Sequence, residues 1–161
     1  RTALEVDDLF FPAKVNLAIL LSQQARFDES EQLLREVLEA YPDQYDSSYS
    51  LALLLVGEGR SDEALPYLAR AAAGLPQRAR VHYNYGLLLA QLDNPQEAEA
   101  ALMTARDLEP ENIDFLFALV DFYFKSGQLD AALEHAQRII SAHPQNRLGY
   151  ELKARIEASR Q

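Results

Sequence analysis

Apolar residues recur at three- and four-residue intervals along most of the chain, a pattern typical of amphipathic α-helices. In residues 85–92, for example, Tyr85, Leu88, Leu89 and Leu92 fall on one side of a helix. Short polar segments interrupt the pattern, and some contain glycine, which readily adopts the left-handed backbone of a tight turn. The pattern therefore predicts an all-α chain of short helices joined by turns.

A repeat underlies these helices, because four prolines stand at equal distances of 34 residues. They are Pro42, Pro76, Pro110 and Pro144. Proline lacks an N–H group and disfavours helical geometry in the residue before it, so each proline is expected to end a helix. Two columns of similar residues share the period. The large apolar column, expected in the core, is Leu17, Leu51, Tyr85 and Leu119. The small column is Ser30, Ala64, Ala98 and Ala132. The period predicts four repeats of two helices each, over residues 11–44, 45–78, 79–112 and 113–146.

Both ends of the chain fit the same period. Residues 1–10 are similar to the end of a repeat with Asp8 in the place of the proline, so we interpret them as the tail of a truncated preceding repeat. Residues 147–161 predict one more helix, with an apolar stripe of Leu148, Leu152 and Ile156 and an opposite polar side. A terminal helix of a repeat array needs such a polar side, so we interpret it as a capping helix. We expect the full-length protein to be longer than 161 residues.

A 34-residue helix–turn–helix repeat with these prolines and columns resembles the tetratricopeptide repeat (TPR) family. The resemblance covers residues 11–146 and implies a right-handed solenoid of antiparallel helix hairpins. Four full repeats and the C-terminal capping helix make up this all-α fold. The chain departs from the family where tryptophan is favoured. The residues at that position are Lys14, Ser48, His82 and Leu116.

The resemblance implies a non-catalytic scaffold that binds proteins or peptides in a concave groove lined by the first helix of each repeat. The positions that match the groove are Asn16, Ile19, Tyr49, Ser50, Leu53, Arg80, Tyr83, Asn84, Leu87, Phe117, Asp121 and Phe124. Tyr49, Tyr83 and Phe117 share one column, and aromatic rings on an exposed wall are common binding hot spots. The alternative is that these rings are buried against adjacent helices.

Two further groove features concern the kind of peptide. Asn16 and Asn84 match the asparagines with which some TPR proteins hold a peptide backbone. Arg80 is the one well-placed base, and Asp46, Asp114 and other acids surround it, so it cannot form the basic clamp that binds chaperone C-termini. We predict no tight binding of acidic C-terminal chaperone peptides, and expect instead a peptide with apolar anchors and at most one acid for Arg80.

Composition removes several other classes of function. The net charge of −10 disfavours nucleic acids and anionic membrane surfaces. The chain has no cysteine, and no apolar run of about 18 residues that predicts a membrane span. No phosphate-binding loop or nucleophile motif is present, so neither enzymatic activity nor a cofactor is expected. The histidines are interpreted as surface residues without a metal. They are His82, His135 and His143.

Three alternatives remain beside the scaffold. Residues 11–17 loosely resemble TPR segments of bacterial chains that also carry multihaem cytochrome domains, which suggests the repeat arm of a multidomain bacterial enzyme or redox protein. A self-associating structural spacer is another class. The third is a homodimer through the C-terminal end, because residues 113–124 are apolar on nearly every side. If the chain does not form such a dimer, we expect Phe117 and Phe124 to face a ligand. Bacterial cytoplasm and periplasm are both consistent with the sequence.

Overall fold

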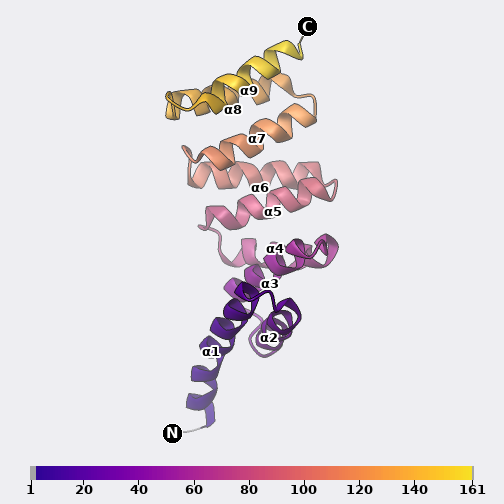
Figure 1. The fold of residues 1–161 in the computed structure, drawn as a ribbon, viewed down its shortest axis with the longest axis vertical. Helices are drawn as coiled ribbons and strands as arrows, with labels where there is room; N and C mark the ends of the chain where they lie inside the picture. The colour runs from indigo at the N-terminus through magenta and orange to yellow at the C-terminus, as the bar shows by residue number, and fades with distance from the viewer. Residues whose placement is uncertain (1–2, 161) are drawn as a thin grey trace. The chain divides into compact units, whose positions relative to one another are not determined.

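The computed structural model describes residues 3–160, with side chains described from residue 11 onward. These residues form nine α-helices and no strand (Figure 1). The helices are α1 (Ala3–Gln23), α2 (Phe27–Ala40), α3 (Tyr45–Gly57), α4 (Ser61–Gly74), α5 (Ala79–Gln91), α6 (Pro95–Leu108), α7 (Ile113–Lys125), α8 (Leu129–Ala142) and α9 (Arg147–Ala158). The helices belong to two compact units, residues 1–75 and residues 76–161.

The first unit consists of two helix hairpins, α1–α2 and α3–α4, and α2 also packs on α3. Its core is built from aliphatic side chains that recur on one face of each helix. They include Leu34, Val37, Leu51, Leu55 and Leu68. Gly74 lies against the ring of Tyr45, and a Cβ atom at Gly74 would stand only 2.1 Å from that ring. Such close approach explains why a small residue ends α4.

The second unit repeats the arrangement with the hairpins α5–α6 and α7–α8, and α9 packs on α8. One hydrophobic cluster joins Leu102 of α6 to Leu119 of α7, Ile139 of α8 and Ile156 of α9. The polar side of α9 faces outward, since Glu151, Arg155 and Glu157 are all exposed.

The turn inside each hairpin uses a left-handed residue at the same repeat position. Gly59 and Gly127 have φ angles of 77° and 74°, and the equivalent Ala25 and Asp93 both have 58°. The two glycines were expected from the sequence. Alanine and aspartate adopt the same geometry because the following hairpin helix must turn back at that point, although the left-handed region costs a non-glycine residue about 1 kcal/mol.

Three expectations from the sequence differ from the structure. Helix α1 runs without a break through residue 10 and through Pro12, so the proposed boundary between residues 10 and 11 does not coincide with a turn. Leu17, expected in the core, is about half exposed. His135, expected on the surface, is buried in α8, where its ring stacks on Tyr123 with 5.5 Å between ring centroids.

Candidate functional site

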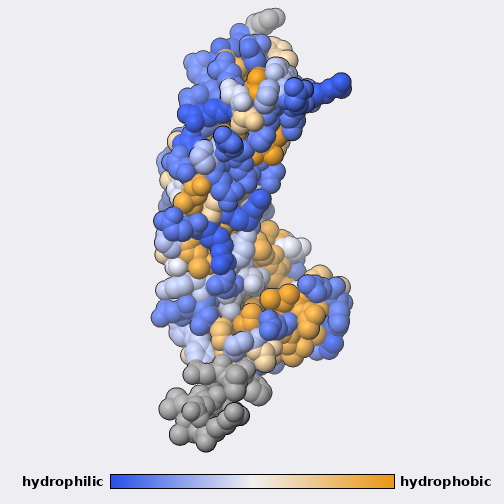
Figure 2. Space-filling model, turned by 90° about the vertical axis from the view of Figure 1, so that its left-hand side faces the viewer, coloured by the Kyte–Doolittle hydropathy of each residue, from blue (hydrophilic) through white to orange (hydrophobic). Residues whose placement is uncertain are grey.

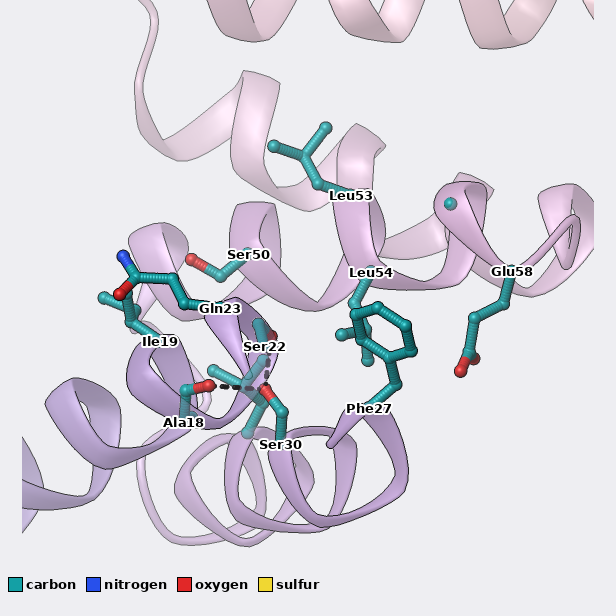
Figure 3. A pocket seen from close by; sticks show the side chains of 12 residues that line it. Ala18, Ile19, Ser22, Gln23, Phe27, Ser30, Ser50, Leu53, Leu54 and Glu58 are labelled. Atoms are coloured by element: carbon teal, nitrogen blue, oxygen red, sulfur yellow. Dashed lines mark hydrogen bonds between the residues drawn. The ribbon is translucent and has the colours of Figure 1, made fainter. Parts of the chain in front are cut away.

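A pocket of about 380 Å³ opens between α1, α2 and the C-terminal half of α3 in the first unit (Figure 3). Its walls are mostly apolar. The lining residues are Ala18, Ile19, Ser22, Gln23, Phe27, Ser30, Leu34, Ser50, Leu53, Leu54, Gly57 and Glu58. Ile19, Phe27 and Leu53 are 44 %, 43 % and 40 % exposed. Large apolar side chains left open to water around a concavity are a common mark of a binding site.

The hydroxyl groups in this pocket are hydrogen-bonded to protein atoms. The Ser30 hydroxyl donates to the carbonyl oxygen of Ala18 over 2.7 Å. Since a serine has one hydroxyl hydrogen, the Ser22 hydroxyl is the donor in the 2.8 Å contact with Ser30. Figure 3 shows this chain of hydrogen bonds, with Ile19 and Gln23 on one side of the view and Phe27 and Glu58 on the other. Because both hydroxyl hydrogens are used, neither of these serines presents an unpaired donor to an apolar guest.

The charged groups beside the pocket are also paired. Glu58 accepts a hydrogen bond from Arg60 at 3.1 Å, and the same guanidinium contacts Glu31 at 2.6 Å and Glu63 at 2.8 Å. The hydrogen bond from Arg60 lowers the pKa of the Glu31 carboxyl, so this network remains charged at neutral pH. It holds the turn between α3 and α4 at the edge of the pocket.

The second unit has a pocket of about 600 Å³ at the equivalent place, two repeats later in the chain. Its lining residues are Leu87, Ala90, Gln91, Asp93, Pro95, Leu102, Ala118, Asp121, Phe122, Lys125 and Ser126. Asp121 stands at the position of Leu53 and Lys125 at that of Gly57, and the two form an ion pair of 2.7 Å. The first pocket is thus the more apolar version of a site that this chain builds twice.

The pockets bring together five of the residues predicted for the groove. Ile19, Ser50 and Leu53 line the first pocket, and Leu87 and Asp121 line the second. The Ser50 hydroxyl donates to the carbonyl oxygen of Asp46, so it adds no free donor to the first pocket.

The aromatic column is only partly exposed. Tyr49 and Tyr83 are half-buried, and the Tyr83 ring lies 5.0 Å from the ring of Phe115. Phe117 is the most exposed of the three, at 40 %. Phe124, expected to face a ligand, is half-buried with the Arg155 guanidinium 4.4 Å from its ring centroid. This end of the second unit is therefore partly covered by α9.

Arg80, which was expected to meet an acid of the ligand, already has a partner. Its guanidinium lies 3.2 Å from a carboxylate oxygen of Asp114 and stacks over the rings of Tyr83 and Phe115. The pair is exposed and contributes little to stability. It nevertheless reduces the positive charge at the one position where an acidic peptide terminus was considered. The two asparagines of the predicted groove lie apart from both pockets, Asn16 exposed and Asn84 half-buried.

Phe27 is an exposed apolar residue of the first pocket that the sequence did not predict for the groove. It begins the second helix of its hairpin, and the groove prediction considered only first helices. The sequence does single this position out. The equivalent residues of the other repeats are Ser61, Pro95 and Leu129, and serine and proline are common at the start of a helix, whereas Phe27 is a large apolar residue there. A phenylalanine there adds an apolar wall that the second pocket lacks.

Among the residues whose side chains the structure describes, no group of three His, Asp or Glu side chains is arranged to hold a metal ion. None of the described helices is long and apolar enough to cross a bilayer.

Comparison with known proteins agrees with this architecture. Two family models described as tetratricopeptide repeat match the chain, one over residues 94–156 and the other over residues 15–79 and 49–104. The chain belongs to the tetratricopeptide repeat family, and its all-α fold of helix hairpins is that of a TPR solenoid, as the sequence predicted. No curated protein sequence matches the chain.

Several solved structures share the fold at low sequence identity. A crystal structure of MamA has a TM-score of 0.86 at 21 % identity, and the match covers 93 % of this chain and 82 % of the MamA chain. MamA from Desulfovibrio magneticus has a TM-score of 0.77 at 22 % identity, and the match covers 84 % of this chain and 77 % of the MamA chain. YrrB, described as a TPR protein with an unusual peptide-binding site, has a TM-score of 0.79 at 23 % identity. The match covers 94 % of this chain and 78 % of the YrrB chain. At these identities the likeness concerns the fold.

Proposed function

We propose that this chain is a non-catalytic scaffold that binds a peptide segment of a partner protein, and that the pocket between α1, α2 and α3 receives an apolar side chain of that peptide. The observation that carries the proposal is the combination of exposed Ile19, Phe27 and Leu53 with hydroxyls that are already hydrogen-bonded. Burying an apolar side chain there releases water from both surfaces without leaving the serine hydroxyls unpaired.

The fold class favours a peptide over a small molecule. TPR arrays are extended binding surfaces, and YrrB is a relative in fold whose description includes a peptide-binding site. The net charge of −10 favours a peptide that carries Lys or Arg beside its apolar anchor, because opposite charge speeds association. The repeat arm of a multidomain bacterial enzyme or redox protein and a self-associating spacer are the alternatives, and either is compatible with the same pocket.

The two equivalent pockets supply a matched test. Leu53→Asp gives the first pocket the residue that the second one has at Asp121, and Leu87→Asp makes the same change at an equally exposed leucine of the second pocket. Peptides are first selected from a random phage-displayed library on the full chain, and their dissociation constants are then measured by calorimetry.

We expect the selected peptides to share a Leu, Ile or Phe anchor. Leu53→Asp should weaken their binding at least tenfold, equivalent to about 1.4 kcal/mol, because a carboxylate would be desolvated by the anchor. Leu87→Asp should change the dissociation constant less than about threefold. Equal losses of affinity in both variants, or a loss only in Leu87→Asp, would mean that the peptide does not bind in the first pocket. Circular dichroism checks that both variants remain helical.

A further inference from the structure

The pocket of about 600 Å³ in the second unit differs from the first pocket in its charged groups. Asp93, Asp121 and Lys125 line it, whereas the described lining of the first pocket has one charged side chain, Glu58. At the repeat position of Asp93 the first unit has Ala25, which carries no charge. The second unit thus places carboxylates where the first has apolar groups, which indicates a guest of a different chemistry.

The two carboxylates of this pocket are open to a further partner. Asp93 has no ion pair or side-chain hydrogen bond among the residues whose side chains the structure describes. It lies in the left-handed turn before α6, where it is exposed. Asp121 is paired with Lys125 at 2.7 Å, but the Lys125 side chain is 74 % exposed, and such exposed pairs contribute little. An incoming cation therefore meets one unpaired carboxylate and a second that is only weakly engaged.

The helix ends around the pocket also favour a positive charge. Helix α5 ends at Gln91 and α7 at Lys125, and residues from both last turns line the pocket. The carbonyl end of a helix carries a partial negative charge. The amino end of α6 also meets the pocket, but it begins with Pro95, which lacks an N–H donor. Two negative helix ends are thus set against one weakened positive end.

The remaining walls of the pocket are largely apolar. Leu87 and Ala90 are exposed, Phe122 is half-buried, and Leu102 and Ala118 are buried. On the face of the second unit that Figure 2 shows, apolar areas are small and lie between polar side chains. A guest with an apolar stem and a cationic head matches such a lining, and arginine and lysine have this form.

We propose that this second pocket binds an arginine side chain of a partner protein, with the guanidinium in reach of Asp93 and Asp121 and the aliphatic stem against the apolar wall. Arginine fits better than lysine because its planar guanidinium has five donors, enough for two carboxylates, and stacks on aromatic rings such as Phe122. The same unit already stacks Arg155 over the ring of Phe124, 4.4 Å from its centroid. The proposal does not depend on an apolar anchor in the first pocket.

The test uses two small probes that have no apolar anchor. They are N-acetyl-arginine N-methylamide and the neutral N-acetyl-citrulline N-methylamide, which has nearly the same shape. Each is titrated at low salt into the ¹⁵N-labelled full chain, and the NMR chemical shifts of the backbone amides are followed. We expect the arginine probe to shift the amides of residues 87–95 and 118–126 with a millimolar dissociation constant. The citrulline probe should bind about threefold more weakly, because it lacks the charge.

Three variants separate this site from a general attraction of cations to an acidic chain. Asp93→Asn should weaken binding of the arginine probe about threefold, and asparagine tolerates the left-handed backbone of that turn. Lys125→Gln should strengthen binding about twofold, because it removes the cation that competes for Asp121. Asp28→Asn makes the same change of charge at an exposed acid outside both pockets, and it should leave the dissociation constant unchanged.

Several outcomes would overturn the proposal. Equal affinity for the arginine and citrulline probes would show that charge does not select the guest. Equal losses in Asp93→Asn and Asp28→Asn, or shifts scattered outside the pocket, would show that the arginine probe responds only to the net charge. Unshifted pocket amides would show that arginine does not bind there. None of these outcomes bears on the first pocket, whose guest is an apolar side chain, so the two proposals fail separately.

Discussion

Leu51→Ala is expected to lower the free energy of unfolding by about 3 kcal/mol, within the range of roughly 2–5 kcal/mol for a buried leucine. Leu51 is fully buried in α3, so the change would leave a cavity beneath α2. Leu17→Ala, the same change at the same repeat position, is expected to cost about 1 kcal/mol or less because Leu17 is half exposed. Urea unfolding of the full chain, followed by circular dichroism, measures both.

The pair is its own control for helix propensity, since both substitutions replace leucine by alanine inside a helix. The difference between the two variants therefore reports burial. If both variants lost about 3 kcal/mol of unfolding free energy, Leu17 would be buried in this chain, contrary to its exposed fraction.

Lowering the pH from 7.5 to 5 is expected to destabilise the wild-type chain by about 2 kcal/mol more than a His135→Phe variant. Burial lowers the pKa of His135 from its ordinary 6.5 to about 4, and the nearby Arg106 adds to the shift. Its Nδ1 atom has no hydrogen-bond partner among the described residues, so protonation would place an unpaired charge in the core. The full shift of the pKa corresponds to about 3 kcal/mol.

The sign follows from the two states. Between pH 6.5 and 4 the unfolded chain protonates this histidine and the folded chain does not, so acid favours unfolding in that window. The charged and titratable groups around the ring are Arg106 of α6, Tyr123 of α7 and Glu134 and Arg138 of α8. Carboxylates whose pKa is lowered in the fold, such as Glu31, contribute mainly below pH 4.5 and equally in both chains.

Thermal or urea unfolding at the two pH values checks this prediction. His135→Leu is a second variant in case the larger phenylalanine ring does not fit, and His82→Phe is the control, because His82 is not fully buried and lies close to the carbonyl of Pro76. A pH dependence that is the same in the wild type and both His135 variants would contradict the buried, neutral state of the ring.

The candidate pocket shows how far sequence reasoning reached. The predicted groove columns include Ile19 and Leu53, whose repeat position follows from the period alone, and both side chains are exposed in the structure. The columns missed Phe27, because the family pattern assigns ligand contact to first helices. The sequence already placed Asp114 near Arg80, one repeat later at the same position, but did not predict that the two side chains form an ion pair. Such pairs depend on how far one hairpin is displaced from the next, which the pattern does not contain.

The sequence by itself determined that this protein is a chain of helix hairpins of the tetratricopeptide repeat family, because helix periodicity, turn residues and helix-ending prolines act over a few residues and recur every repeat. The tertiary structure alone decided which members of each column are buried. Leu17 and Leu51 occupy the same position in equivalent helices, yet only Leu51 lies under a preceding helix. Likewise, nothing local distinguishes His135 as a core residue until Tyr123 of the neighbouring helix stacks on it. Burial is a property of what packs above a residue, and in a repeat array that neighbour comes from another hairpin.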